Sequence, residues 1–173
     1  MADYHKMWEE LGMDVETHDQ LCEVLPQAFG DVYLSQENRP EGMDYYNFVV
    51  AEIHGVRPAE LIEHQKKGGK VFGTFCVYVP DEVVFAADAI ATGLCGGSQF
   101  WVPGGEKVLP TNTCPLIKAS VGARLDRTCP FFRIADMYVG ETTCDGKKKA
   151  WEILAEDVPV HVMDLPQMKR KKD

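Results

Sequence analysis

The stretch Val71-Phe-Gly-Thr-Phe-Cys-Val-Tyr-Val79 decides how the rest of the chain is interpreted. It is a continuous apolar run, as expected of a strand that is buried on both faces of a parallel sheet. Pro80-Asp81 ends the run, and Asp81 is a suitable N-cap for a helix from Glu82 to about Ala89. A buried strand followed at once by a helix predicts an α/β domain that begins near Lys70.

Three more strands are predicted after this one. They are expected at residues 90–95, 134–139 and 158–165. For the second strand, residues 99–102 remain open as an alternative, and residues 145–156 are expected to form a helix between the third and fourth strands. Strands that alternate with helices predict a four-stranded parallel sheet of the Rossmann or flavodoxin-like kind, with right-handed crossovers and flanking helices.

The first part of the chain has a different pattern and is predicted to be helical. Thr17-His-Asp-Gln20 has the form of a capping box, and residues 43–53 carry an amphipathic pattern that ends at Gly55. A further helix is expected to start with Pro58 at its first position and to stop at Gly68-Gly69. We therefore expect a helical segment at residues 1–69, a parallel α/β domain at 70–166 and a basic tail at 167–173.

Composition excludes several classes of protein. The 173 residues are 45% hydrophobic and 26% charged, as in ordinary globular domains. A net charge of −9 argues against nucleic acid as a partner, and no apolar stretch has the length of a membrane span. The N-terminus lacks the pattern of a signal peptide, so a cytoplasmic protein is expected. In that compartment six cysteines indicate metal binding or catalysis before disulfides.

Four cysteines, Cys95, Cys114, Cys129 and Cys144, stand at turns that lead from strands into helices. Groups that follow the strands of an open parallel sheet collect at its carboxyl edge, where we expect Cys95, Cys114 and Cys144. Cys114 and Cys129 each precede a proline, and Pro115 suits the first position of a helix. A thiol at a helix N-terminus has a lowered pKa, and the backbone N–H groups there help to hold an anionic iron–sulfur cluster.

The other cysteines and the histidines give weaker signals. Cys76, inside the predicted first strand, and Cys22, on a predicted helix, are expected to pack as small hydrophobic side chains. For Cys95 and Cys129 the same structural role is about as well supported as a ligand role. The sequence does not favour a zinc ribbon, because it has no C-x₂-C pair, and its five histidines are scattered without a metal-binding pattern. No catalytic acid or base can be assigned.

Several segments resemble the 2-hydroxyacyl-CoA dehydratase D-component family. They are Leu109-Pro-Thr-Asn-Thr-Cys-Pro-Leu-Ile-Lys118, Cys129-Pro-Phe-Phe132, Val139-Gly-Glu-Thr-Thr-Cys-Asp-Gly-Lys-Lys-Lys149 and Val160-His-Val-Met-Asp-Leu-Pro166. The resemblance covers about residues 70–166. It implies an oxygen-sensitive, low-potential enzyme that receives single electrons from an ATP-hydrolysing activator with its own iron–sulfur cluster. The family includes dehydratase subunits, benzoyl-CoA reductases and double-cubane cluster reductases.

The resemblance also implies cluster ligands. Cys114 and Cys144 match the two family ligands expected in this half of the chain. The surroundings of Cys95 and Cys129 resemble the double-cubane branch, in which six thiolates hold two cubanes joined by a sulfide, so these cysteines are implied as further ligands. The favoured prediction is the N-terminal domain of a reductase with a double-cubane [8Fe–9S] cluster that reduces small substrates.

Two alternatives remain open. One is a subunit of a 2-hydroxyacyl-CoA dehydratase that uses a [4Fe–4S] cluster and a ketyl radical, and the other is a non-catalytic cluster carrier or scaffold. Family chains continue into a second α/β domain that supplies the remaining ligands, whereas this chain stops soon after Leu165-Pro166. The resemblance therefore implies a missing C-terminal domain or partner subunit, a dimer, and a fragment that is inactive alone.

Overall fold

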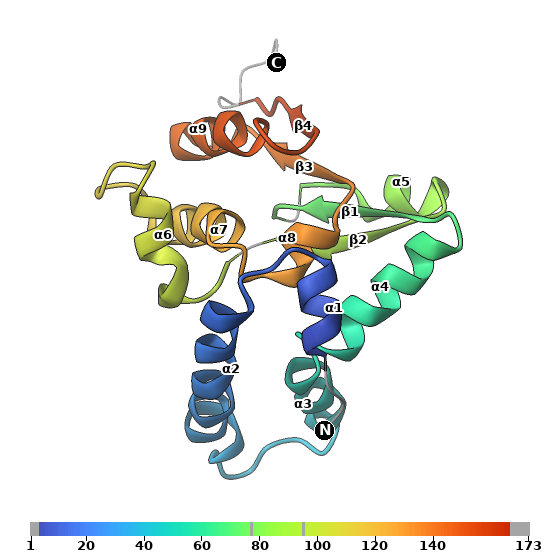
Figure 1. The fold of residues 1–173 in the computed structure, drawn as a ribbon, viewed down its shortest axis with the longest axis vertical. Coiled ribbons are helices and arrows are strands. Elements are labelled where there is room, and N and C mark those ends of the chain that lie inside the picture. The colour runs from blue at the N-terminus through green and yellow to red at the C-terminus, as the bar shows by residue number, and fades with distance from the viewer. Residues whose placement is uncertain (1–3, 77, 95, 167–173) are drawn as a thin grey trace.

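A computed structural model describes residues 4–76, 78–94 and 96–166 of the chain. At its centre lies a four-stranded sheet in which all neighbouring strands are parallel, in the order β2-β1-β3-β4 (Figure 1). The strands are β1 (Lys70–Thr74), β2 (Ala89–Gly93), β3 (Met137–Glu141) and β4 (Val160–Met163). The predicted α/β fold with a parallel sheet is confirmed.

Helices cover both faces of this sheet. They are α5 (Asp81–Ala86) between β1 and β2, then η2 (Gln99–Trp101), α6 (Val102–Glu106), α7 (Pro115–Leu125) and α8 (Pro130–Ile134) before β3, and α9 (Asp145–Leu154) before β4. In Figure 1, α6, α7 and α9 lie to the left of the sheet and α5 to its right. The core is aromatic: the buried Phe75 ring meets Trp151 edge-on at 4.4 Å and Phe132 at 6.0 Å between centroids. Such pairs add stability beyond their buried area.

Several strand boundaries differ from the sequence prediction. The first strand ends at Thr74 and not at Val79, because Cys76 has a φ of 62°, which is incompatible with a strand. The third strand starts only at Met137, since Pro130 begins helix α8, which runs to Ile134. The predicted second strand overlaps β2, and its alternative at residues 99–102 is helical and therefore wrong.

The first part of the described chain forms helices, as predicted. They are α1 (His5–Glu10), α2 (Val15–Phe29), the π-helical η1 (Gly30–Leu34), α3 (Met43–Ala51) and α4 (Val56–Lys66). Asp14, and not Thr17, caps α2, because the Asp14 carboxylate accepts a hydrogen bond of 3.0 Å from the Thr17 backbone N–H. Pro58 is the third residue of α4 and not the first. These differences move helix starts by only two or three residues.

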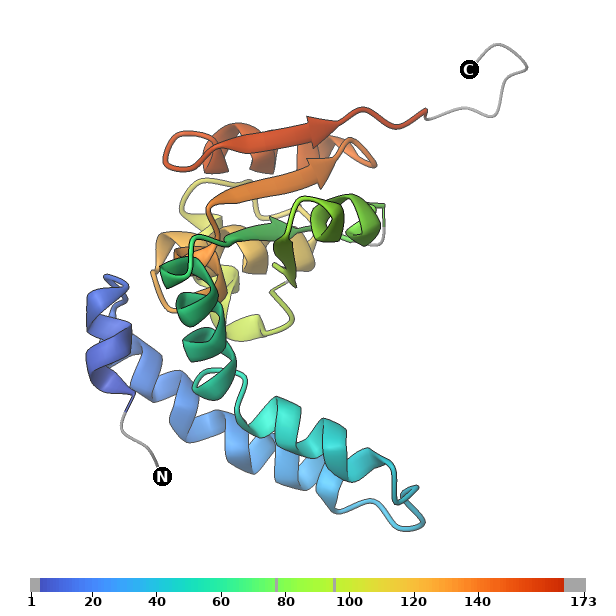
Figure 2. The same ribbon diagram turned by 90° about the vertical axis from the view of Figure 1, so that its right-hand side faces the viewer.

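Helices α2 and α3, with η1 and the segment that joins them, extend away from the sheet as an arm (Figures 1 and 2). The arm exposes many large apolar side chains: Val24, Val32, Tyr33, Leu34, Met43, Tyr45, Tyr46, Phe48, Val50 and Ile53. Its base is tied to the α/β part, where the Asp14 N–H donates to Arg127 O (2.9 Å) and Arg133 Nε donates to Leu11 O (2.8 Å). Within the described parts of the chain, no helix is both long and apolar enough to cross a membrane.

Candidate functional site

The strand order places a crevice at one defined point of the sheet. From β1 the chain moves outward to β2, and it then returns to the other side of β1 to form β3. In open α/β sheets, ligands bind at such a reversal of strand order, beyond the carboxyl ends of the strands. The segment that follows β1 continues alongside β3 here, since the Phe75 N–H donates to Val139 O at 3.1 Å. We call this region the carboxyl edge.

Cys76 lies at the carboxyl edge, two residues after β1. The prediction that it packs inside a strand is wrong, because its thiol is exposed and its backbone is left-handed. Non-glycine residues adopt this conformation rarely, and they do so mostly in turns or at functional positions. The apolar run from Val71 has nine residues, whereas a typical strand has five or six. This length is the feature of the sequence that indicates an end of the strand within the run.

Cys144 follows β3 and occupies the N-cap position of α9, as predicted. Its thiol is exposed, and Lys147 lies on the next turn of the helix. Lys147 Nζ donates a hydrogen bond to Glu141 Oε1. Burial tends to lower the pKa of Lys147, but Glu141, Cys76 and Cys144 raise it, and the net change is upward. A charged ammonium group therefore lies near both thiols.

Cys114 occupies the N-cap position of α7, with Pro115 at the first helical position as predicted, and its thiol is exposed. Lys118 fixes the preceding segment, because its side chain, only 6% exposed, donates to Glu106 Oε1 (2.6 Å) and to Thr111 O (2.7 Å). Held this way, the turn before α7 presents the Cys114 thiol outward.

The starts of α7 and α9 are in contact. A methyl group placed on Gly146 of α9 would lie 3.6 Å from Thr113 Cγ2 and 3.9 Å from Cys144 Sγ. Thr113 directly precedes Cys114, so the N-termini of the two helices converge on the same region. The structure therefore brings Cys76, Cys114 and Cys144 to the carboxyl edge, together with Lys147.

The two remaining predicted ligands are placed differently. Cys129, at the N-cap of α8, is buried near Tyr138, the second residue of β3. Burial raises the pKa of its thiol to about 11, although the backbone N–H groups of Phe132 and Phe131 oppose this. Helix α7 lies between Cys114 and Cys129 in the sequence, with Cys114 at its start and Cys129 after its end. This helix is about 16 Å long at 1.5 Å per residue. Cys95 lies outside the described residues. A ligand role for either cysteine stays a prediction.

The donor set at the carboxyl edge suits an iron–sulfur cluster. Such clusters are bound by cysteine thiolates and stabilised by hydrogen bonds to their sulfur atoms. Two of the three exposed thiols stand at helix starts, where unpaired backbone N–H groups are available. Lys147 also lies in this region, paired with the buried Glu141. The residues therefore fit the implied cofactor in ligand type.

Comparison with known proteins finds related sequences for the second half of the chain. Residues 76–173 match the profile of a family described as 2-hydroxyglutaryl-CoA dehydratase, D-component. Over 106 residues the chain is 46% identical to YjiM of Escherichia coli (strain K12), which is named as a candidate dehydratase subunit. The aligned part is 61% of this chain and 28% of YjiM, so the chain spans less than a third of that relative. The family match begins at Cys76 and contains all the cysteines discussed above except Cys22.

Proposed function

Because the chain belongs to the 2-hydroxyglutaryl-CoA dehydratase D-component family, we propose that it is part of a dehydratase-type enzyme whose carboxyl-edge thiolates bind an iron–sulfur cluster. The observation that carries this proposal is the convergence of three exposed thiols, Cys76, Cys114 and Cys144, on the point where the strand order reverses. The family match supports the dehydratase class, and the geometry supports the place of the cluster.

The finer proposal concerns the branch of the family. We favour a double-cubane reductase that receives electrons from an ATP-dependent activator, with Cys114 and Cys144 as ligands and Cys95 and Cys129 as further ligands. The motifs around these cysteines support this choice. The cluster would supply low-potential electrons to a small substrate. Further thiolates would come from a C-terminal domain or partner subunit, in a dimer.

The residues around the thiols have their own roles in this proposal. Lys147 places a positive charge near Cys76 and Cys144, and Glu141 holds the ammonium group in place. Trp151 Nε1 donates to Glu141 O at 2.8 Å and fixes the end of β3. The Trp151 and Phe75 rings pack together in the core next to this point and exclude water there. A low-potential centre depends on such control of charge and solvent.

One observation favours a second candidate, a dehydratase subunit with a single [4Fe–4S] cluster. Cys129 is buried in the core, and burial raises the pKa of its thiol, so the protonated and unreactive form is favoured. A smaller cluster needs fewer thiolates and would not require Cys129. In this candidate Cys76 is available as a ligand from the carboxyl edge.

Anaerobic reconstitution with iron and sulfide separates these candidates, on this chain and again with a C-terminal domain of the family supplied. About eight irons per unit that are lost in Cys95→Ser or Cys129→Ser would support the double cubane. About four irons, insensitive to those changes but lost in Cys114→Ser or Cys144→Ser, would support the single cluster. Iron binding without turnover in the presence of activator and ATP would indicate a carrier, and indifference of every variant to iron would overturn the proposal.

A further inference from the structure

Two histidines and a cysteine meet at the base of the arm, outside the carboxyl edge. His18 and Cys22 lie one helical turn apart on α2, and His54 lies in the turn between α3 and α4. One ligand atom from each residue lies within 4.8 Å of the other two. The histidines show no metal-binding pattern in the sequence, but the fold brings two of them together with a cysteine. His54 is 36 residues from His18, and only the fold brings the two together.

We propose that His18, Cys22 and His54 form a binding site for one zinc ion. Imidazole nitrogen and thiolate sulfur are the donors that Zn²⁺ prefers, and three protein ligands leave one tetrahedral position for a fourth. The site uses neither the thiols nor the helices of the carboxyl edge, so it is independent of the proposed iron–sulfur cluster.

The donors lie close together, but zinc binding requires two of them to move. Bond lengths to tetrahedral zinc imply about 3.6 Å between a nitrogen and a sulfur ligand and about 3.3 Å between two nitrogens. Cys22 Sγ lies 3.6 Å from His18 Nε2 and 3.7 Å from His18 Nδ1, so the thiol lies over the imidazole ring and has to rotate toward the lone pair of Nε2. His18 Nε2 and His54 Nδ1 lie 2.6 Å apart and share a hydrogen bond. The ion would replace this bond and separate the two nitrogens by about 0.7 Å. His54 lies in a turn, where such a movement requires no break in a helix.

Neighbouring groups orient the two imidazoles, as groups around metal ligands commonly do. Trp8 Nε1 donates to His54 O at 2.8 Å, and the Trp8 ring meets the His18 ring edge-on at 4.2 Å. Burial lowers the pKa of both histidines to about 4, so the imidazoles are in the neutral form that binds metal. Burial raises the pKa of Cys22 to about 11 in the metal-free protein, and a bound cation would lower it.

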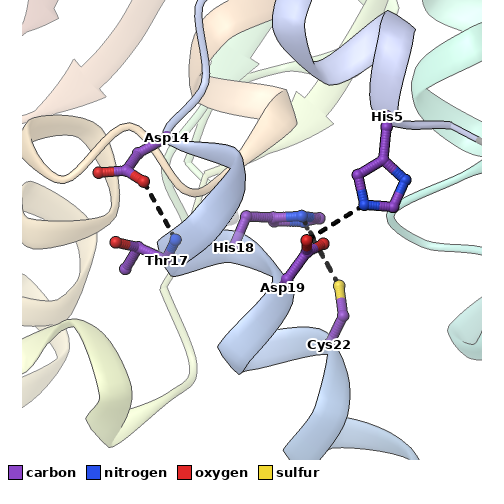
Figure 3. A network of polar contacts seen from close by, with 6 residues as sticks. All are labelled: His5, Asp14, Thr17, His18, Asp19 and Cys22. Carbon is purple, nitrogen blue, oxygen red and sulfur yellow. Dashed lines mark hydrogen bonds and ion pairs between the residues drawn. The ribbon is translucent and has the colours of Figure 1, made fainter.

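A water molecule would supply the fourth ligand. Figure 3 shows the neighbouring Asp19 carboxylate directed toward His5. The distance from Asp19 Oδ2 to His5 Nε2 is 3.1 Å, and Asp19 is not among the residues whose ligand atoms converge. A bound ion would join α2 to the turn before α4 and fix the base of the arm.

Cobalt and zinc titrations of the chain, freed of metal with a chelator, test the site. The background is a variant with Cys76, Cys114 and Cys144 changed to Ser, which removes the exposed thiols of the carboxyl edge. We expect one Zn²⁺ per chain, and Co²⁺ should give an intense thiolate charge-transfer band with tetrahedral d–d absorption. Adding Cys22→Ser should abolish the band and weaken Co²⁺ binding by at least about a hundredfold, since loss of a direct ligand should cost at least as much as loss of a supporting group.

His161→Gln serves as the matched control, because this exposed histidine on β4 should leave metal binding unchanged. If the Cys22→Ser protein does not fold, the background variant with intact Cys22 still gives a result, because a chelator should lower its melting temperature and zinc should restore it. A Co²⁺ spectrum that survives Cys22→Ser, or a melting temperature insensitive to chelator and zinc, would overturn the site. Cys22→Ser should leave iron reconstitution intact, so failure of this site is distinguishable from failure of the iron–sulfur proposal.

Discussion

Glu141 is fully buried at the end of β3, and its charge is compensated by Lys147. Removing one partner of a buried ion pair leaves an uncompensated charge. We therefore expect Lys147→Met to lower the free energy of unfolding by about 3 kcal/mol, measured by urea denaturation. The double variant Glu141→Gln/Lys147→Met should recover much of this loss.

The double variant of Glu141 and Lys147 also distinguishes a structural role of Lys147 from an electrostatic role at the neighbouring thiols. In the double variant the fold is restored, but Cys76 and Cys144 lack the adjacent positive charge. Iron incorporation should therefore stay below that of the wild type even though stability returns. Full iron incorporation in the double variant would show that Lys147 serves the fold alone.

The carboxylate of Asp136 leads to a prediction for the stability of the fold at acid pH. Its Oδ2 accepts hydrogen bonds from the Val71 N–H (2.9 Å) and Gln65 Nε2 (2.8 Å), and its Oδ1 accepts from Lys70 Nζ (2.9 Å). Burial would raise its pKa, but these donors outweigh burial and lower it. The folded pKa is thus below the unfolded value, so the stabilisation is present above about pH 4 and is lost as pH falls through the folded pKa.

Asp136→Asn removes this titration while keeping the shape of the side chain. We expect it to lower stability at neutral pH by about 2 kcal/mol, because charge-assisted hydrogen bonds are lost. Below pH 4 the difference between variant and wild type should shrink, as measured by urea denaturation across pH. A difference that stays constant from pH 7 to pH 2 would contradict this account.

At the scale of single residues, local chemistry was predictable and long-range contacts were not. The N-cap positions of Cys114 and Cys144 follow from their immediate neighbours, a proline in one case and an adjacent strand and helix in the other. The exposure of Cys76 depends on a backbone reversal inside an apolar run that contains no glycine after Gly73. The approach of His54 to His18 depends on how the arm folds back, which no local pattern encodes.

At the scale of elements, close packing of α6 on α7 places the loop that carries Cys114. A methyl group on Gly105 would lie 2.0 Å from Lys118 O, and one on Gly122 would lie 1.9 Å from Trp101 O. Both neighbours are backbone atoms, which cannot rotate away. The two helices can therefore approach this closely only because glycine occupies both positions.

We expect Gly105→Ala to lower the free energy of unfolding by about 3 kcal/mol, because the added methyl group forces the helices apart. Gly97→Ala is the matched control, since a methyl group there would meet nothing within 4 Å, and its effect should be below about 0.5 kcal/mol. Equal effects of the two changes in thermal or urea unfolding would argue against tight packing of α6 on α7.

The alternation of strands and helices was visible in the sequence because it follows from apolar runs and turn residues. Boundaries were less predictable, because tertiary packing sets them. Ile134 is apolar and lies three residues before β3, but Pro130 starts a helix that includes it. The segment 99–102 is apolar enough for a strand, yet Trp101 Nε1 donates to Thr128 Oγ1 at 2.7 Å from a helical turn.

At the scale of the whole molecule, two separate regions hold groups suited to metals. The carboxyl edge presents exposed thiols at the reversal of the strand order, and the base of the arm holds a half-buried His–Cys–His set. The family relationship concerns the first region, since the matched residues begin at Cys76, beyond the arm. The two proposed metal-binding regions therefore lie in different parts of the described chain, one at the parallel sheet and one among the N-terminal helices.

The central claim is that the carboxyl-edge thiols bind the iron–sulfur cluster, and iron content tests it most directly. Wild type, Cys114→Ser, Cys144→Ser and the control Cys22→Ser would be reconstituted anaerobically together with the C-terminal domain, and iron and sulfide would be counted per chain. We predict that Cys114→Ser and Cys144→Ser lose most of the iron while Cys22→Ser retains it. Retention of iron in both carboxyl-edge variants, with the fold intact, would contradict the account.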